Sequence, residues 1–184
     1  MNYPQWTTWL IGLIGISGTA HATCPTNVVK LKPDSRYEVV AGATPAGSEV
    51  RDKVTGLIWQ RCMNGMTWNG STCTGVAATA NWKTTLDLAR LATPSTAPSA
   101  QAWRVPSYAE LISLTDRSCY APAINETWFP ATSSGPTWTS SPSSEIDPLV
   151  FPHLVLYTWG VSFSSGNSFY YYGRANTWPV RFVR

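Results

Sequence analysis

Stretches with different hydrophobic periodicity follow one another along this chain. Residues 9–16 are a continuous apolar run. Residues 81–91 and 107–114 carry apolar side chains three or four positions apart, the spacing of a helix with one buried face. From residue 156 to 163, large apolar residues alternate with small or polar ones, as in a half-buried strand. The pattern predicts an α+β protein with two helices, short antiparallel strands and long ordered loops.

Each predicted helix has a starting signal. Asn81 can cap the first helix, and Leu86 and Ala89 follow at helical spacing. Ser107 and Glu110 form a Ser-x-x-Glu capping box at the start of the second helix. Because capping is a sufficient role for Ser107, we do not expect it to be a nucleophile. The predicted buried stripe of the second helix is Leu111, Ile112 and Leu114.

Short strands are predicted in both halves of the chain. The odd-numbered residues of 156–163 should face the core, because successive strand residues point to opposite sides. Residues 164–167 are a plausible hairpin turn. In the last strand, Val180 and Phe182 should point inward. The expected strands are residues 37–40, 54–61 with a break at Gly56, 138–141, 156–163, 169–172 and 178–183.

The N-terminus has the pattern of a secretory signal peptide. The apolar run is followed by small residues and by the sequence AHA at residues 20–22, so we expect cleavage before Thr23. The run is shorter than the roughly 20 residues that span a bilayer. The alternative is a buried N-terminal segment. We expect an exported protein that is periplasmic, on the cell surface or extracellular, without stable membrane insertion after residues 1–22 are removed.

Composition agrees with an extracellular domain and excludes some partners. Charged residues make up 12% of the chain, about half the usual share, while it has 10 Trp, 14 Pro and 13 Gly. A net charge of +3 is too small to indicate a nucleic-acid partner. No acidic residue follows Asp147, whereas Arg174, Arg181 and Arg184 do, so the last third is expected to be weakly basic.

Four cysteines follow the expected cleavage site. An even number in an exported chain indicates disulfides, with three possible connectivities. The segment from Cys62 to Cys73 contains two Asn-Gly turns that can bring its ends together. We therefore expect Cys62 to pair with Cys73 and Cys24 with Cys119.

The sequence offers little for metal binding or catalysis. There is no Cys-x-x-Cys pair, and His153 is the one histidine after the expected cleavage site. Calcium needs six to eight oxygen ligands, whereas the acidic residues here are few and scattered. No cofactor motif is present, so we expect no metal, no cofactor and no enzymatic activity. Asp52 and Asp116 are expected to form buried pairs with arginines such as Arg61, Arg104 or Arg181.

A group of aromatic and cationic side chains near the C-terminus is the predicted ligand-binding site. Aromatic rings can stack on sugars or anchor a protein partner. A guanidinium group can bind sulfate or carboxylate. At least one of the consecutive tyrosines should pack inside, because they alternate between the two faces of a strand. The predicted site consists of Tyr170, Tyr172, Arg174 and Trp178.

Several collinear motifs resemble the C-terminal domain family of Lcl, a bacterial collagen-like adhesin. They are the pattern D-x-x-T-G-L-x-W-x-R-C over 52–62, WRVP at 103–106, WTSS at 138–141 and VRFVR at 180–184. The resemblance covers residues 48–184, leaving residues 23–47 as an extended segment packed on this domain. It implies a C-type-lectin-like fold, with two helices flanking a twisted antiparallel sheet.

The resemblance and the export signal together suggest a function. We expect a secreted or surface ligand-binding module, adhesin-like, that binds an extracellular glycan or protein without transforming it. The alternative is a structural component of a surface appendage or envelope complex. Fold alone does not decide between these functions.

Overall fold

The computed structural model describes residues 24–25, 27–93, 95, 98, 101–143 and 157–184. The expected signal peptide, residues 1–22, lies outside the described residues, as do His153 and the acidic residues Glu145 and Asp147. The predicted α+β class is confirmed, and the strands are divided among three small antiparallel sheets.

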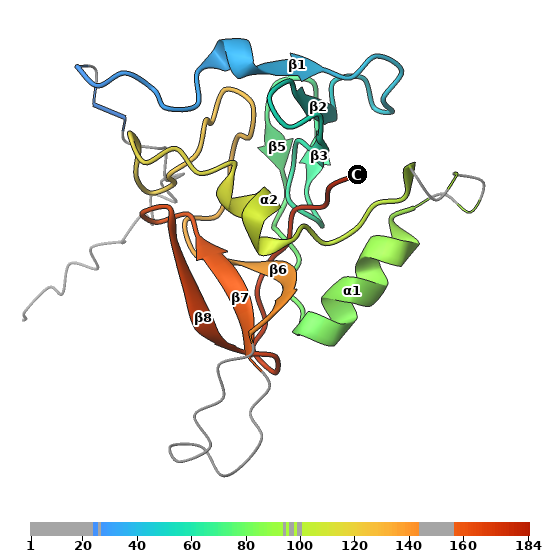
Figure 1. The fold of residues 1–184 in the computed structure, drawn as a ribbon. Coiled ribbons are helices and arrows are strands. Elements are labelled where there is room, and N and C mark those ends of the chain that lie inside the picture. Colours follow the sequence, from blue (N-terminus) through green and yellow to red (C-terminus); the bar gives the residue numbers. More distant parts are fainter. Residues whose placement is uncertain (1–23, 26, 94, 96–97, 99–100, 144–156) are drawn as a thin grey trace, which may run out of the picture.

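Figure 1 shows how these elements are arranged. The first sheet has the order β1-β2-β3, the second is the pair β4-β5, and the third has the order β6-β7-β8. The elements are η1 (Asp34–Arg36), β1 (Tyr37–Val39), β2 (Glu49–Asp52), β3 (Ile58–Gln60), β4 (Thr67–Trp68), β5 (Cys73–Thr74), α1 (Trp82–Leu91), α2 (Tyr108–Ile112), β6 (Pro136–Pro142), β7 (Tyr157–Ser162) and β8 (Asn167–Gly173).

Both predicted helix starts are confirmed. The side chain of Asn81 accepts a hydrogen bond from the Thr84 amide at 2.9 Å and caps α1. At the start of α2, the Ser107 hydroxyl accepts from the Glu110 amide, and the Glu110 carboxylate accepts from the Ser107 amide at 2.7 Å. Local hydrogen bonding therefore determines where each helix begins. Leu111 and Leu114 of the predicted stripe are fully buried, and Ile112 is half-buried.

The first sheet contains one strand that the sequence pattern missed. β2 pairs with both β1 and β3, and its buried positions are Val50 and Asp52. A buried aspartate interrupts apolar alternation, so periodicity alone does not reveal this strand. The predicted strand at 54–61 starts later, at Ile58, because the Gly56 amide bonds to the Asp52 carbonyl and closes a turn.

The C-terminal segment differs from its prediction. Residues 178–183 form isolated bridges rather than a regular strand, and Val183 pairs with Trp59 on one side and Arg104 on the other. Val180 and Phe182 are buried as expected, but Arg181 and Val183 are fully buried too. The prediction that only alternate residues face inward is wrong, because this segment runs through the interior and is covered on both sides.

The alternation predicted for residues 156–163 is not seen over the described part, 157–163, because the residues expected to face outward, Thr158, Gly160 and Ser162, are all buried. Val161 and Phe163 are fully buried, whereas Tyr157 and Trp159 are half-buried and Thr158 is fully buried. The pairing of β7 with β8 shifts register between Thr158 and Gly160. A register irregularity changes which residues share a face, so the simple alternation is lost there.

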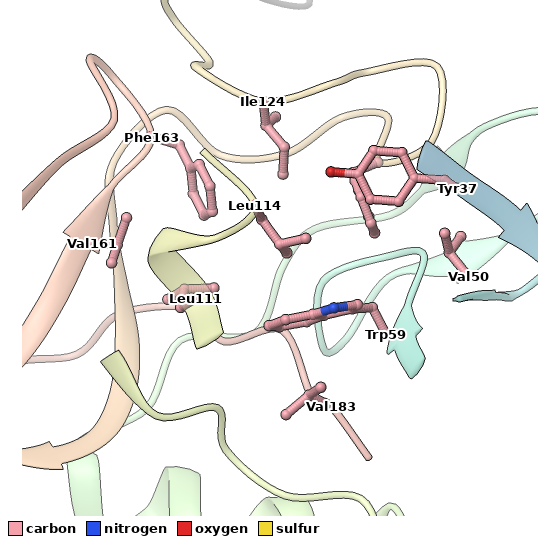
Figure 2. Packing of buried hydrophobic residues seen from close by; sticks show 10 residues of the cluster. Tyr37, Val50, Trp59, Leu111, Leu114, Ile124, Val161, Phe163 and Val183 are labelled. Carbon is pink, nitrogen blue, oxygen red and sulfur yellow. The ribbon is translucent and has the colours of Figure 1, made fainter. Parts of the chain in front are cut away.

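Two large hydrophobic clusters form the core of the described residues, and a third, small one consists of Cys62, Trp68 and Cys73. In the largest one, the Trp59 indole lies between Leu114 and Val183 in the view of Figure 2. Val161 and Phe163 belong to the same cluster, so it joins the first sheet, α2 and the third sheet. The second large cluster packs α1 against the C-terminal segment and β6, and its buried members are Ala89, Trp103, Val105, Trp138, Val180 and Phe182.

All four cysteines form disulfide bonds. Cys24 is bonded to Cys119 and Cys62 to Cys73, which is the expected pairing. The first bond links residues 95 positions apart, and the second closes a short loop of 11. Within the described ranges, no helix has the length and apolar character needed to cross a membrane.

The buried carboxylates do not have the partners that the sequence suggested. Asp52 is paired with Arg36, whose Nε donates to it at 2.9 Å. Asp116 accepts hydrogen bonds from backbone amides, including that of Lys32 at 2.9 Å. The expected pairs with Arg61, Arg104 or Arg181 are therefore wrong. Both carboxylates instead attach the segment before β1 to the rest of the protein.

Candidate functional site

The predicted C-terminal site is only partly visible. Tyr170 and Tyr172 belong to β8, but their side chains lie outside the described residues. Arg174 is half-buried and lies over the Trp82 ring at 4.2 Å, while its Nε donates to the Thr158 hydroxyl at 3.1 Å. These contacts connect α1 to the third sheet, so Arg174 has a structural role.

Trp178 also packs against neighbouring elements. Its ring lies 4.5 Å from that of Trp138, and its backbone pairs with Ala80 just before α1. The Trp138 indole donates to the Ala80 carbonyl at 2.7 Å. The structure therefore brings Arg174 and Trp178 to the start of the same helix, where both hold α1 in place.

A groove at another part of the molecule was not anticipated from the sequence. We call it the loop groove; its volume is about 610 Å³. It lies where the β1–β2 connection, the Cys62–Cys73 loop and the C-terminus meet, and Figure 1 shows the C-terminus beside β3. Its lining comes from residues 40–45 and 48–49, Gln60, residues 62–68, Ala92, Trp103 and Arg184.

An ion pair lies at one end of the loop groove. Arg184 donates to the Glu49 carboxylate at 2.6 Å, and its guanidinium lies over the Trp103 ring at 4.6 Å. Its other donor group reaches the Gln101 carbonyl at 3.3 Å. The pair ties the C-terminal residue to β2, and it leaves charged oxygen and nitrogen atoms next to an aromatic face.

The loop that forms one wall of the groove is tightly held. The Cys62–Cys73 bond closes it, and the Ala78 amide donates to the Asn64 carbonyl at 2.8 Å. Gly65 has a φ of +90°, and a Cβ atom there would lie 2.6 Å from the backbone nitrogen of Ala78. Only glycine fits such a close approach. The wall is therefore largely preformed.

The fold separates the arginines that were expected to make the last third of the chain weakly basic. Arg181 is fully buried, and burial lowers its pKa to about 9. Arg184 is neutralised by Glu49. Arg174 is the remaining member, and it is half-buried against Trp82. The three arginines therefore do not act as one positive surface.

The carboxylates that might serve as general acids or bases have structural partners. Burial alone would raise the pKa of Asp52, but hydrogen bonds from Arg36 and the Val54 amide hold it below its usual value. The pKa of Glu110 is lowered by the hydrogen bond from Arg104. Asp116 has a lowered pKa because hydrogen bonds from Ser118 and backbone amides outweigh the effect of burial. All three stay ionised at neutral pH.

One feature of the sequence pointed to part of the loop groove. The two Asn-Gly turns between Cys62 and Cys73 indicated a compact loop, which the structure contains. Nothing in the sequence showed that this loop would face residues 40–45 and Arg184, because those segments are far apart along the chain. Among the described residues, no group of three or more His, Cys, Asp or Glu side chains is placed to hold a metal ion.

Comparison with known proteins identifies the family. The model of the Lcl C-terminal domain matches residues 48–184. The chain therefore belongs to the Lcl C-terminal domain family. No curated protein and no solved structure matches it.

Proposed function

We propose that this member of the Lcl C-terminal domain family is an exported, non-catalytic ligand-binding module that binds an extracellular glycan or protein, as an adhesin does. The loop groove carries the proposal. It is a preformed hollow of about 610 Å³ at a loop-rich end of a disulfide-bonded domain. Binding sites are typically concave, largely preformed and lined by apolar surface with a few placed polar groups.

The chemistry of the lining supports recognition rather than reaction. Gln60, Asn64 and Thr67 supply hydrogen-bonding groups, and Met66 and Trp103 supply apolar surface. Sugars and peptides both present alternating apolar and hydrogen-bonding groups, which such a surface can match. The carboxylates Asp52, Glu110 and Asp116 are each held in structural hydrogen bonds, which supports a non-catalytic role.

A glycan and peptide array with residues 23–184 tests the proposal. The Asn64→Ala/Thr67→Ala variant removes two polar groups from the groove wall, and we expect binding to the best array ligand to weaken about tenfold or more. Thr79→Ala is the matched control, because Thr79 is exposed and is not part of the lining. Equal binding by the two variants and the wild type would rule out the groove.

The predicted C-terminal site remains a second surface to test. The triple variant Tyr170→Ala/Tyr172→Ala/Arg174→Ala should retain array binding if the loop groove is the site. If binding is lost in this variant and kept in the groove variant, the ligand binds at β8 and not in the loop groove. The melting temperature of the triple variant must be measured alongside, because Arg174 packs on Trp82.

One observation favours the alternative role in assembly. Apolar side chains of the N-terminal segment are exposed, with Val29 at 85% and Leu31 at 63%. Exposed apolar groups can mark a protein–protein interface. Pull-down from envelope fractions with residues 23–184 discriminates between the roles. A stoichiometric partner lost in Val29→Ser/Leu31→Ser would favour assembly, and its absence would favour a free ligand binder.

Export and the finer fold class are part of the same proposal. The pattern at residues 9–22 supports cleavage before Thr23, and two disulfides suit an oxidising compartment. The family and the two helices support a C-type-lectin-like arrangement. N-terminal sequencing of exported protein tests the first point. Superposition of an experimental structure on C-type lectins tests the second.

A further inference from the structure

Arg61 is a buried cation that has no carboxylate partner among the described residues. It follows β3 directly, it is only 7% exposed, and its guanidinium carbon lies 4.4 Å from the Trp68 ring centre and 5.1 Å from that of Trp128. Cation–π contacts of this kind are favourable by about 0.5–2 kcal/mol each. Ring contacts accept no conventional hydrogen bond, so the N–H groups of the guanidinium still need acceptors.

Those N–H groups have no acceptor among the described residues. The Nε atom of Arg61 is buried without a hydrogen-bond partner, and so is the indole nitrogen of Trp128. The ion pairs between described residues use other arginines, such as Arg36 and Arg104. A buried guanidinium without a carboxylate or carbonyl partner is costly, because desolvation is not offset.

A second buried cation, Arg181, contacts the backbone of Arg61. Arg181 lies behind Arg61 and donates a hydrogen bond to the Arg61 carbonyl. Arg181 also has no carboxylate partner within the described ranges; its acceptors are the carbonyls of Gln60 and Arg61 and the hydroxyl of Thr132. Arg181 is fully buried, so Arg61 is the outer of the two cations and the one that an external anion could reach.

Only the outer group can meet a ligand. Nε of Arg61 is fully covered, so an external ligand would have to bind the two Nη groups. Nη1 lies near Gly47, where a Cβ atom would be 3.9 Å from it, an ordinary contact distance, and 3.1 Å from the Trp68 indole nitrogen. Gly47 therefore borders the site, and its φ of +81° favours glycine at this position.

We propose that Arg61, flanked by Trp68 and Trp128, binds a carboxylate group of an external ligand. The paired Nη donors match the two oxygens of a carboxylate in one plane. A carboxylate is planar, so both of its oxygens can lie in the guanidinium plane, and the titration below compares it with the tetrahedral sulfate. The site includes Trp68, which also lines the loop groove, but it does not use Asn64 or Thr67. Acetate binding at Arg61 and ligand binding in the loop groove can therefore succeed or fail separately.

NMR titration of residues 23–184 with sodium acetate tests the proposal. The signals followed are the arginine Nε–H groups and the tryptophan indole N–H groups, at neutral pH and constant ionic strength. We expect saturable shifts of the Arg61 and Trp128 signals with acetate, much weaker shifts with sulfate and none with chloride. Shifts that grow linearly, that chloride reproduces, or that saturate at lower sulfate than acetate would overturn it.

Three variants complete the experiment. Arg61→Lys keeps the charge but loses the paired donors, so acetate should bind at least fivefold more weakly, and the same variant assigns the Arg61 signal. Arg61→Met should abolish the saturable shift of the Trp128 indole, and its persistence would overturn the proposal. Arg90→Met is the matched control, because Arg90 is an exposed arginine on α1, and it should bind acetate as the wild type does. If Arg61→Met does not fold, the wild-type titration alone decides.

Discussion

The surroundings of Arg181 and of Arg61 show two ways of burying a guanidinium group. Both lie over aromatic rings, Arg181 over Phe129 at 4.9 Å and Arg61 over Trp68 at 4.4 Å. Neither has a carboxylate partner among the described residues. Arg181 nevertheless donates to two backbone carbonyls and to the Thr132 hydroxyl. The Arg61 guanidinium has no such acceptor within the described ranges, although one of the carbonyls that Arg181 uses belongs to Arg61.

The difference separates a structural cation from one available to a ligand. Backbone carbonyls compensate for the burial of Arg181, and they join the C-terminal segment to β3 and to Thr132. Burial lowers the pKa of Arg181 to about 9, which still leaves it charged at neutral pH. In the part of the chain that the structure describes, the Arg61 guanidinium has only ring contacts, which leaves its N–H groups for the external anion proposed above.

The largest expected effect tests the structural arginine. Arg181→Met leaves the Gln60 and Arg61 carbonyls and the Thr132 hydroxyl without their donor in a fully buried position. At 1–3 kcal/mol for each unsatisfied group, we expect the free energy of unfolding to fall by about 4 kcal/mol. Urea denaturation followed by circular dichroism measures it. A loss below about 1 kcal/mol would show that these bonds are not structural.

Opening the short disulfide tests the link between the loop and Arg61. The Cys62→Ser/Cys73→Ser variant removes an 11-residue closure, which should cost about 3 kcal/mol of unfolding free energy. Because Trp68 lies within this loop, the acetate affinity at Arg61 should fall as well. In the Cys24→Ser/Cys119→Ser control, acetate affinity should be unchanged below the melting temperature. The same loss in both variants would contradict a local effect.

A third arginine, Arg36, supplies the contrast of a guanidinium with a carboxylate partner. Asp52 has a lowered pKa in the folded protein, so its contribution to stability is present at neutral pH and is lost as the pH falls through that lowered value. We expect Asp52→Asn to cost about 2 kcal/mol at neutral pH. Its stability should also change less than that of the wild type below about pH 4. Parallel pH profiles of unfolding free energy would refute this.

The smallest effect on stability is expected at Arg61. Arg61→Met exchanges two ring contacts and an uncompensated buried charge for an apolar side chain. Since these terms oppose each other, the free energy of unfolding should change by less than about 1 kcal/mol. Thermal melts in chloride, without acetate, measure it. A loss as large as that of Arg181→Met would place Arg61 in the structural class and remove the contrast between the two.

Local features of the fold could be predicted because neighbours along the chain form them. The cap at Asn81 and the capping box of Ser107 and Glu110 each involve residues three positions apart. The turn at 164–167 and the return strand β8 follow from adjacent sequence in the same way. The Cys62–Cys73 pairing was predictable because the turns between the two cysteines bring them together.

The predictions that were wrong concern features that depend on contacts between residues far apart along the chain. The strand β2 contains Asp52, whose burial depends on Arg36 sixteen residues away. The C-terminal segment was expected to have one inward face, but it lies between β3 and Arg104 and is covered on both sides. Burial on both sides cannot be read from the alternation of one segment. The partners of a buried charge likewise depend on which distant segments meet it.

By itself, the sequence determined the family, the helix starts, the cysteine pairing and the aromatic, charge-poor composition, since these depend on residue identity and short spacing. Only the tertiary structure decided that the C-terminal segment is interior, that the loop groove forms, and that Arg61 meets rings instead of acceptors. The physical reason is that desolvation of a charged group is set by everything packed around it. For Arg61 those neighbours come from positions as distant as Trp128.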